Sequence, residues 1–272
     1  MAYQGKHTNK TKQRRPLLPV LLLLGTLVVT AVLLTVILRG CKTDTPGSLL
    51  PTTELTAGLT ADCFAEENGF LTCTQRAAKI GIDVSTHQGK IDWQQVADAG
   101  VEVAIVRIGG RGYTEGGIFR DDCFHDNVVG AHAVGIETGA YFFSQATSVD
   151  EAIEEARTVC EWVAPYDMTY PIVFDWECLT DGRTASVSYA DITAFAEAFC
   201  RTVEENGYRA GVYLNLEMTF WMDTQKLDAY DFWLAEYSDC PSVTNVPDGW
   251  QYTNGGTVAG IDGTVDLDLF FE

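Results

Sequence analysis

The chain is poor in basic residues, and those it has are unevenly placed. Only 18 Lys and Arg residues stand against 38 Asp and Glu residues, which gives a formal net charge of −20. Seven of the 18 lie in residues 1–42, which contain no acid, so residues 43–272 hold 11 basic residues against all 38 acids. Nucleic acid phosphates are bound by clustered Lys and Arg. The shortage of such clusters argues against nucleic acid as a partner.

Signatures of several enzyme classes are also missing. The sequence has no Gly-x-Ser-x-Gly nucleophile elbow and no Gly-Lys-Ser/Thr phosphate loop. Its four histidines (His7, His87, His125 and His132) are scattered, and no Cys/His spacing is typical of a zinc site. The glycine-rich stretch 109–112 lacks the dinucleotide spacing, and we expect it to form a flexible loop beside a cleft. The sequence therefore predicts neither a metal nor a cofactor.

One long apolar run lies near the N-terminus. Residues 17–38 carry no charge, and these 22 residues match the roughly 20 that span a bilayer as a helix. The run exceeds the ~7–15 apolar residues of a signal peptide, and the five bases before it predict a cytoplasmic N-terminus. We expect a basic tail at 1–16, a transmembrane anchor at 17–38 and a single-pass cell-membrane protein with its remaining residues outside the cell. A cleaved signal peptide, or lipid attachment at Cys41, is the alternative.

Residues 39–78 are expected to form an extracellular stalk, since residues 43–60 are rich in Thr, Pro and Gly. Cys63 and Cys73 bracket Glu-Glu-Asn-Gly, a hairpin turn signal, and could form a local disulfide. Cys160 and Cys200 each fall in the second half of an expected helix, where they could be buried thiols or a bridge. Pairing cannot be deduced from the sequence alone.

From residue 79 onward, strand and helix signals alternate. Apolar strands are expected at 79–84, 103–108, 137–143 and 171–174, and again at 211–213, 232–235, 249–252 and 265–268. Helices are expected at 92–100, 122–134, 148–163 and 188–207. Such alternation indicates α/β architecture with parallel strands. We expect residues 79–272 to form an irregular TIM-like β/α barrel whose C-terminal third is poor in helix.

Acidic residues occur at the ends of these strands. Asp83 ends the first strand, Asp175 and Glu177 end the fourth, and Asp266 lies in the last. Carboxylates beside apolar strands are costly to desolvate, so several of them give a structure no advantage. Active sites of β/α barrels gather at the carboxyl ends of the strands. These four acids are therefore candidate catalytic residues.

The Asp175-Trp176-Glu177 triplet is the sharpest of these signals. Residues two apart in a strand point to one face, about 6.6 Å apart along the chain. Two neighbouring acids resist joint ionisation, so one is pushed towards its protonated form. Glycoside hydrolysis uses such a pair, one acid to protonate the leaving oxygen and one carboxylate to assist. Taken alone, the pair is a weak signal, because two acids at a strand end of so acidic a domain are often solvated.

Several aromatic residues lie near the strand ends and could stack on sugar rings. They are Tyr141, Tyr213, Trp233, Tyr237, Trp250 and Tyr252. Core packing is the alternative for each of them. His87 could contact substrate or merely satisfy a turn.

The segments containing these residues resemble glycoside hydrolase family 25, the N-acetylmuramidases or lysozymes. The resemblance rests on an ordered set of segments, namely 81–93, 139–143, Pro171-Ile-Val-Phe-Asp-Trp-Glu177, 207–213, 232–237, 250–252 and 258–266. It implies an irregular barrel that cleaves the β-1,4 bond between N-acetylmuramic acid and N-acetylglucosamine in peptidoglycan.

By the same resemblance, Glu177 matches the general acid and Asp175 the nearby carboxylate, which acts either as nucleophile or on the substrate's own N-acetyl group. Asp83 and Asp266 match two further acids of the cleft, and Gln251 of the Trp-Gln-Tyr segment is a candidate substrate contact. The sequence departs from the usual pattern at Phe142, where His is common, and at Asp268, where Asn is common. We expect these two departures to affect contacts with the substrate more than the role of the four acids.

We therefore expect a peptidoglycan hydrolase tethered to the outer face of the membrane for cell-wall remodelling. No appended wall-binding repeats are visible, and a tether would raise the effective concentration near the wall. A catalytically weak wall-glycan-binding protein and a chitinase-like glycosidase are the alternatives. The sequence identifies no protein partner.

Overall fold

The computed structural model describes residues 58–177, 182–243 and 245–272 of the chain. The expected transmembrane anchor at 17–38 and most of the expected stalk lie outside these ranges. Within them, no helix is both long and apolar enough to cross a bilayer. The described residues belong to one compact unit, Leu55–Glu272, and the expected boundary at residue 79 falls inside it.

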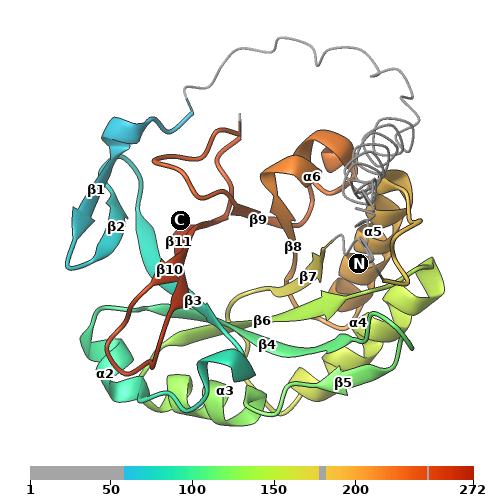
Figure 1. Ribbon diagram of the computed structural model, residues 1–272, viewed down its shortest axis with the longest axis horizontal. Helices are drawn as coiled ribbons and strands as arrows, with labels where there is room; N and C mark the ends of the chain where they lie inside the picture. The colour runs from blue at the N-terminus through green and yellow to red at the C-terminus, as the bar shows by residue number, and fades with distance from the viewer. Residues whose placement is uncertain (1–57, 178–181, 244) are drawn as a thin grey trace, which may run out of the picture. The chain divides into compact units, whose positions relative to one another are not determined.

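Eight strands close into a barrel, as expected (Figure 1). They are β3 (Ala78–Val84), β4 (Val103–Arg111), β6 (Glu137–Ser144), β7 (Ile172–Trp176), β8 (Ala210–Asn215), β9 (Asp231–Ala235), β10 (Gly249–Gly256) and β11 (Val265–Phe271). The order around the barrel is β3-β11-β10-β9-β8-β7-β6-β4, and pairing of β3 with β4 closes it. A short strand, β5 (Ile118–Arg120), pairs antiparallel with residues 109–111 at the end of β4.

The last strand runs against its neighbours. β11 is antiparallel to both β10 and β3, whereas the other barrel pairings are parallel. In this register Asp266 lies opposite Asp83. Because β11 runs in the opposite direction, an acid at its start lies at the same end of the barrel as acids at the ends of the parallel strands. This end is the mouth of the barrel.

Helices cover the first two thirds of the barrel. They are α2 (Trp93–Asp98), α3 (Phe124–Ala133), α4 (Val149–Val163), α5 (Tyr189–Glu205) and α6 (Leu216–Trp221), with three short 3₁₀ turns at Ala61–Cys63 (η1), Thr86–Gln88 (η2) and Thr224–Lys226 (η3). Side-chain caps fix their starts, since Asp92 and Ser148 accept hydrogen bonds from the third residue of α2 and α4. The Ser188 capping box starts α5, which buries Ile192, Phe195, Ala196, Phe199 and Val203 in the core.

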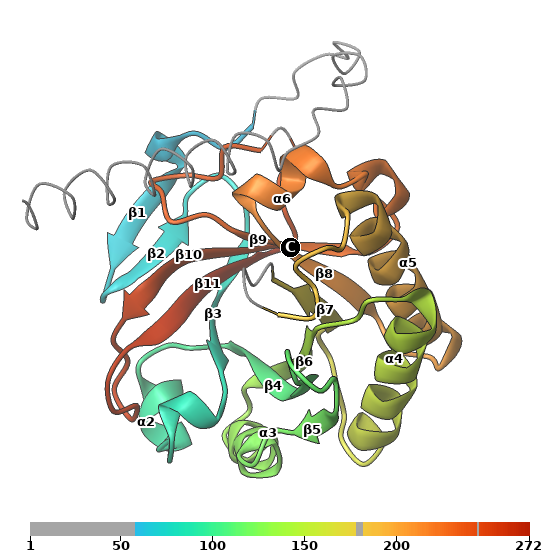
Figure 2. The same cartoon turned by 45° about the vertical axis from the view of Figure 1, so that its right-hand side comes forward.

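The C-terminal third is poor in helix, as predicted. Between β9 and the C-terminus the described residues contain no helix. A hairpin of β1 (Phe64–Glu67) and β2 (Phe70–Cys73) lies beside β10 and β11 instead (Figure 2). The Phe64 ring is 5.0 Å from that of Trp250, and the Leu71 N–H donates to the Tyr252 hydroxyl at 3.2 Å. The hairpin thus supplies the apolar cover that helices give elsewhere.

The hairpin turn matches its sequence signal. Asn68 and Gly69 both have positive φ, 55° and 85°, the conformation that a two-residue Asn-Gly turn requires. Cys63, just before the hairpin, and Cys73, its last residue, are free, as are the other four cysteines within the described residues. Cys160 and Cys200 are therefore buried thiols on α4 and α5 rather than a bridge.

The expectation of a flexible loop at 109–112 was wrong for most of that stretch. Residues 109–111 continue β4 and are buried. A Cβ at Gly109 would lie 2.2 Å from the Phe119 carbonyl oxygen of β5, and at Gly110 it would lie 2.9 Å from the Phe143 carbonyl oxygen. The glycines therefore permit close approach of neighbouring backbones, which is a strand role of glycine.

The barrel interior is packed below its mouth. Val103, Ile105, Val173, Trp233 and Phe270 form a separate apolar cluster inside the strands, distinct from the larger core between strands and helices. Inward residues of β/α barrels fill the interior in this way. The interior beneath the polar residues of the mouth is therefore filled by apolar side chains.

Candidate active site

A cavity of about 280 Å³ lies at the mouth of the barrel. It is lined by Asp83, Arg107, Tyr141, Phe143, Asp175, Glu177, Tyr213, Trp233, Tyr237, Gln251, Asn254 and Asp266. All four predicted acids and five of the eight candidate substrate contacts are in this set. Of the other three, His87 is exposed on η2 and does not line the cavity.

Strand β7 places Asp175 and Glu177 on the cavity side. Asp175 pairs in register with Phe143 on β6 and with Tyr213 on β8, so it sits between two other lining residues. Trp176 points to the opposite side, where its indole donates to the Ala146 carbonyl at 3.3 Å. This alternation is what the triplet predicted for an extended segment.

Gln251 links one acid to two tyrosines. Its amide nitrogen donates to Asp83 Oδ2 at 2.7 Å, and its amide oxygen accepts from the hydroxyls of Tyr213 and Tyr237, each at 3.0 Å. Because both ends of the amide are engaged, its orientation is fixed. Tyr237 remains 54% exposed, so its ring offers an accessible face at the edge of the cavity.

The carboxyl groups of the cavity hold their protons more tightly than usual. Burial raises the pKa of Asp175 well above its ordinary value, and the charges of Glu177 and Asp83 raise it further. Burial, then the charge of Asp266, raises the pKa of Glu177. Burial also raises the pKa of Asp83 and of Asp266. Like charges in a low-dielectric site cannot all ionise together.

Arg107 is the one basic residue that lines the cavity among the described residues, and sequence reasoning missed it. Its guanidinium pairs with Asp121, both Nε and Nη2 lying 2.7 Å from Oδ2. The Asp121 side chain is fully buried and also accepts from the backbone N–H groups of Thr86 and Cys123. The positive charge of Arg107 lowers the pKa of Asp175, against the larger effects that raise it.

One oxygen of Asp175 has no partner in the described part of the chain. Asp175 is only 5% exposed, and its Oδ1 is buried without a hydrogen bond. An unsatisfied buried carboxylate oxygen is costly, and natural structures keep few of them. Since Asp175 lines the cavity, a ligand that donates a hydrogen bond would meet its carboxylate there.

Asp268 has a related arrangement inside the barrel. It is fully buried on β11, where Oδ1 accepts from the Trp233 indole at 2.9 Å and Oδ2 has no partner among the described residues. Burial, then the charge of Asp83, raises its pKa. Asp268 therefore supports Trp233 from below rather than lining the cavity.

Trp250 and Tyr252 are not part of the site. Both face the hairpin and the outer core, in agreement with the core-packing alternative. The remaining candidate aromatics all line the cavity.

A larger cavity, about 480 Å³, lies at the opposite end of the barrel. Its charged lining residues are mostly paired, including Lys79 with Glu137 at 2.6 Å and Arg209 with Asp231. Because paired charges do not need a ligand, the smaller cavity with its unpaired acids is the better candidate for chemistry.

The chain is similar to several known proteins. A family model for glycosyl hydrolases family 25 matches residues 82–261. The autolytic lysozyme of Clostridium acetobutylicum is 28% identical over 195 residues, covering 71% of this chain and 56% of that protein. Lysozyme M1 of Streptomyces globisporus is 29% identical over 206 residues, covering 70% of this chain and 67% of that protein.

Solved structures show the same fold. The modular autolysin LytC of Streptococcus pneumoniae, in complex with a synthetic peptidoglycan ligand, matches with TM-score 0.63 and 25% identity, covering 76% of this chain and 52% of that chain. A family 25 glycosyl hydrolase of Bacillus anthracis matches with TM-score 0.64 and 21% identity, covering 76% and 95%. The chain thus spans about half the length of the first of these relatives and of LytC.

Proposed function

This chain belongs to glycosyl hydrolase family 25, and from that premise we propose that it hydrolyses peptidoglycan at the β-1,4 bond between N-acetylmuramic acid and N-acetylglucosamine. The observation that carries the proposal is the convergence of four carboxyl groups, from three strands, on one cavity. Their burial and mutual repulsion raise their pKa values, which favours the protonated state that acid catalysis needs.

Glu177 is the proposed general acid. It lies at the end of β7 beside the cavity, and burial and Asp266 both raise its pKa. A raised pKa keeps its proton available closer to neutral pH, where it can be given to the leaving glycosidic oxygen. Asp83, held by Gln251, and Asp266 add negative charge that favours the developing positive charge of the sugar.

Asp175 is the proposed assisting carboxylate. Its carboxylate lines the cavity and suits the N–H of a substrate acetamido group, which would then be oriented to attack the sugar carbon. The same carboxylate could attack the sugar directly as nucleophile. Both routes use an ionised Asp175, so the charge of Arg107, which lowers its pKa, assists either one.

The relatives support the substrate class. Two of them are named as lysozymes, and the LytC structure contains a synthetic peptidoglycan ligand. In this chain the exposed face of Tyr237 and the lining positions of Tyr141 and Tyr213 would receive sugar rings. Aromatic faces are suited to such apolar sugar surfaces.

We also propose that the chain acts from the outer face of the cell membrane, held by residues 17–38. The support is the uncharged run of 22 residues and the bases that precede it. Wall remodelling next to the membrane fits a tethered enzyme. Full-length protein should open intact walls faster than residues 43–272 added from outside, and equal rates would overturn the tether.

The reaction is tested by digesting purified peptidoglycan and identifying the new reducing sugar by mass spectrometry. Reducing muramic acid is expected, whereas reducing glucosamine would indicate a glucosaminidase. Purified chitin serves as the parallel substrate, and products from chitin alone would identify a chitinase-like enzyme. Binding to the wall without any reducing ends would identify a glycan-binding protein.

A further inference from the structure

We propose that Gln145 is a positioning residue for Glu177, and that ion pairs between glutamates of α4 and the arginines Arg111 and Arg183 fix Gln145 in turn. The proposal rests on the function proposed above, because it concerns the acid of that reaction. Gln145 does not line the cavity and has no direct part in the chemistry.

The backbone of Glu177 needs support from outside its own strand. The described pairings of β7 with its neighbours end at Trp176 on one side and Asp175 on the other. The residues just after β6 provide the support. The Gln145 amide donates to the Glu177 carbonyl at 3.3 Å, and the Ala146 carbonyl accepts from the Trp176 indole at 3.3 Å.

Gln145 is itself held on several sides. It is fully buried, and its amide nitrogen also donates to the Ser144 carbonyl at 2.9 Å. Its amide oxygen accepts from the Thr184 hydroxyl at 3.1 Å, and its backbone carbonyl accepts from Arg183 at 2.9 Å. A buried amide with both ends satisfied has one orientation.

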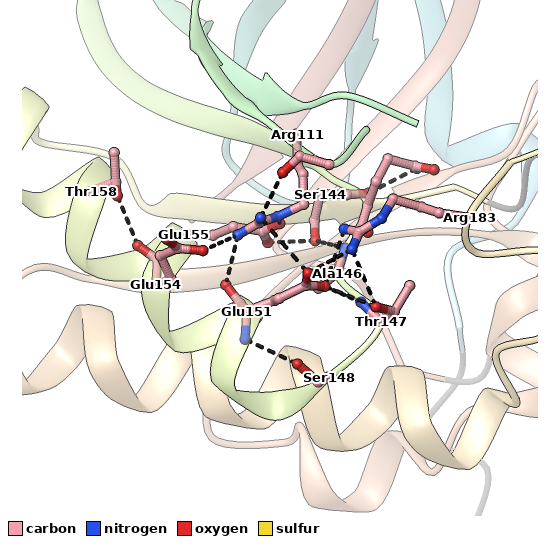
Figure 3. Close-up of polar contacts among 12 residues, drawn as sticks. Arg111, Ser144, Ala146, Thr147, Ser148, Glu151, Glu154, Glu155, Thr158 and Arg183 are labelled. Carbon is pink, nitrogen blue, oxygen red and sulfur yellow. Dashed lines mark hydrogen bonds and ion pairs between the residues drawn. The ribbon is translucent and has the colours of Figure 1, made fainter. Parts of the chain in front are cut away.

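Next to this segment, glutamates of α4 form ion pairs with Arg111 of β4 and with Arg183 (Figure 3). Arg111 Nε donates to Glu155 at 2.6 Å, and the other oxygen of Glu155 accepts from the Ser144 hydroxyl at 2.6 Å. Ser144 Oγ then accepts from the Ala146 N–H at 3.2 Å. The cluster thereby reaches Ala146, whose carbonyl accepts from the Trp176 indole.

A second pair in the cluster fixes the other side of Gln145. Arg183 binds both oxygens of Glu151, at 2.6 and 3.1 Å, and the same carboxylate accepts from the Thr147 N–H at 2.8 Å. Two-point Arg–carboxylate contacts set geometry as well as energy. Since the cluster is remote from the cavity, its effect on the reaction passes through Gln145 and Ala146.

The test is steady-state kinetics and pH profiles of full-length variants in mild detergent on purified peptidoglycan. A misplacement of about 1 Å in a catalytic group can cost on the order of 100-fold in rate. For Gln145→Leu we expect kcat to fall by about tenfold or more, since the acid is misplaced, with KM within about twofold because no cavity contact is lost. The alkaline limb of the kcat profile should also move to lower pH, since a loosened Glu177 is less desolvated.

Gln145→Glu separates positioning from loss of stability. The substitution keeps the size of the side chain, but its carboxylate cannot donate to the Glu177 carbonyl. At acidic pH the introduced carboxyl is protonated and can donate again, so activity relative to wild type should recover as pH falls. Asn206→Ala is the matched control, because Asn206 also donates its amide to a backbone carbonyl, that of Thr202 at 2.8 Å, at the far end of α5. It should leave kcat, KM and the pH profile unchanged.

Glu177→Gln in the same assay separates the two proposals. If Glu177→Gln retains wild-type rate, the proposed function fails. If Glu177→Gln is inactive while both Gln145 variants keep wild-type kcat and pH profile, the positioning role alone is overturned. A Gln145→Glu variant that is impaired equally at every pH would also overturn it.

Discussion

The hairpin that precedes the barrel should stabilise it strongly, and Phe70→Ala tests this. Phe70 on β2 is 3% exposed and belongs to the same apolar core as Trp250 and Leu269 of the last strands. Truncating a buried Phe to Ala removes its transfer free energy and leaves a cavity, at a cost of about 3–5 kcal/mol. That is a large share of the ~5–15 kcal/mol that stabilises a typical domain.

Thermal unfolding of full-length protein in mild detergent measures this cost. For a domain of this size, 1 kcal/mol corresponds to about 2–4 °C in Tm, so Phe70→Ala should lower Tm by roughly 6–20 °C. Phe220→Ala is the matched control, since Phe220 is 76% exposed on α6. A surface substitution of this kind changes stability by about 0.5 kcal/mol at most, so Tm should stay within about 2 °C.

Loss of the hairpin contact should also reach the active site. Strands β10 and β11 carry Gln251 and Asp266 on the face opposite the hairpin. On heating, Phe70→Ala should therefore lose activity at the temperature at which it unfolds. This temperature should be lower than the unfolding temperature of the wild type. If Phe70→Ala unfolds at the wild-type temperature, the hairpin belongs to the stalk and does not stabilise the barrel.

Two further substitutions test the electrostatics of the cavity. Asp266→Asn removes a charge that raises the pKa of Glu177, so the alkaline limb of kcat/KM, where Glu177 loses its proton, should move to lower pH; an unmoved limb would exclude Glu177 as the titrating acid. Arg107→Gln removes the charge that lowers the pKa of Asp175, so the acidic limb, where Asp175 gains a proton, should move to higher pH. A shift of that limb to lower pH would show that Arg107 does not act on Asp175.

Much of the barrel could be predicted because its strands and helices carry strong local signals. The capping residues Asp92, Ser148 and Ser188 start helices where expected, and the Asn68-Gly69 turn forms the expected hairpin. Pairing between distant strands has no local signal. The antiparallel direction of β11 was therefore not predicted, nor was the packing of the hairpin on Trp250.

The acids of the site could be predicted because charge in an apolar strand is costly and stands out. The same signal was present at Arg107, a charged residue within Val103-Ala-Ile-Val-Arg-Ile. A single base, however, does not indicate a particular chemistry as a pair of acids does. Its buried partner Asp121 lies outside any strand, and only the fold brings the two together. Gln145 gave no signal either, since its partners are backbone carbonyls and a distant hydroxyl.

The central claim, that Glu177 is the acid of a muramidase, is tested most directly by one comparison. Wild type and Glu177→Gln, matched in fold and concentration, are given purified peptidoglycan, and the release of reducing muramic acid is followed. Loss of a general acid typically costs about 10²–10⁴-fold in rate. If Glu177 is the acid, the rate should fall by such a factor with the Tm unchanged or raised, because Gln removes a desolvated carboxyl group. Release at the wild-type rate by Glu177→Gln would contradict it.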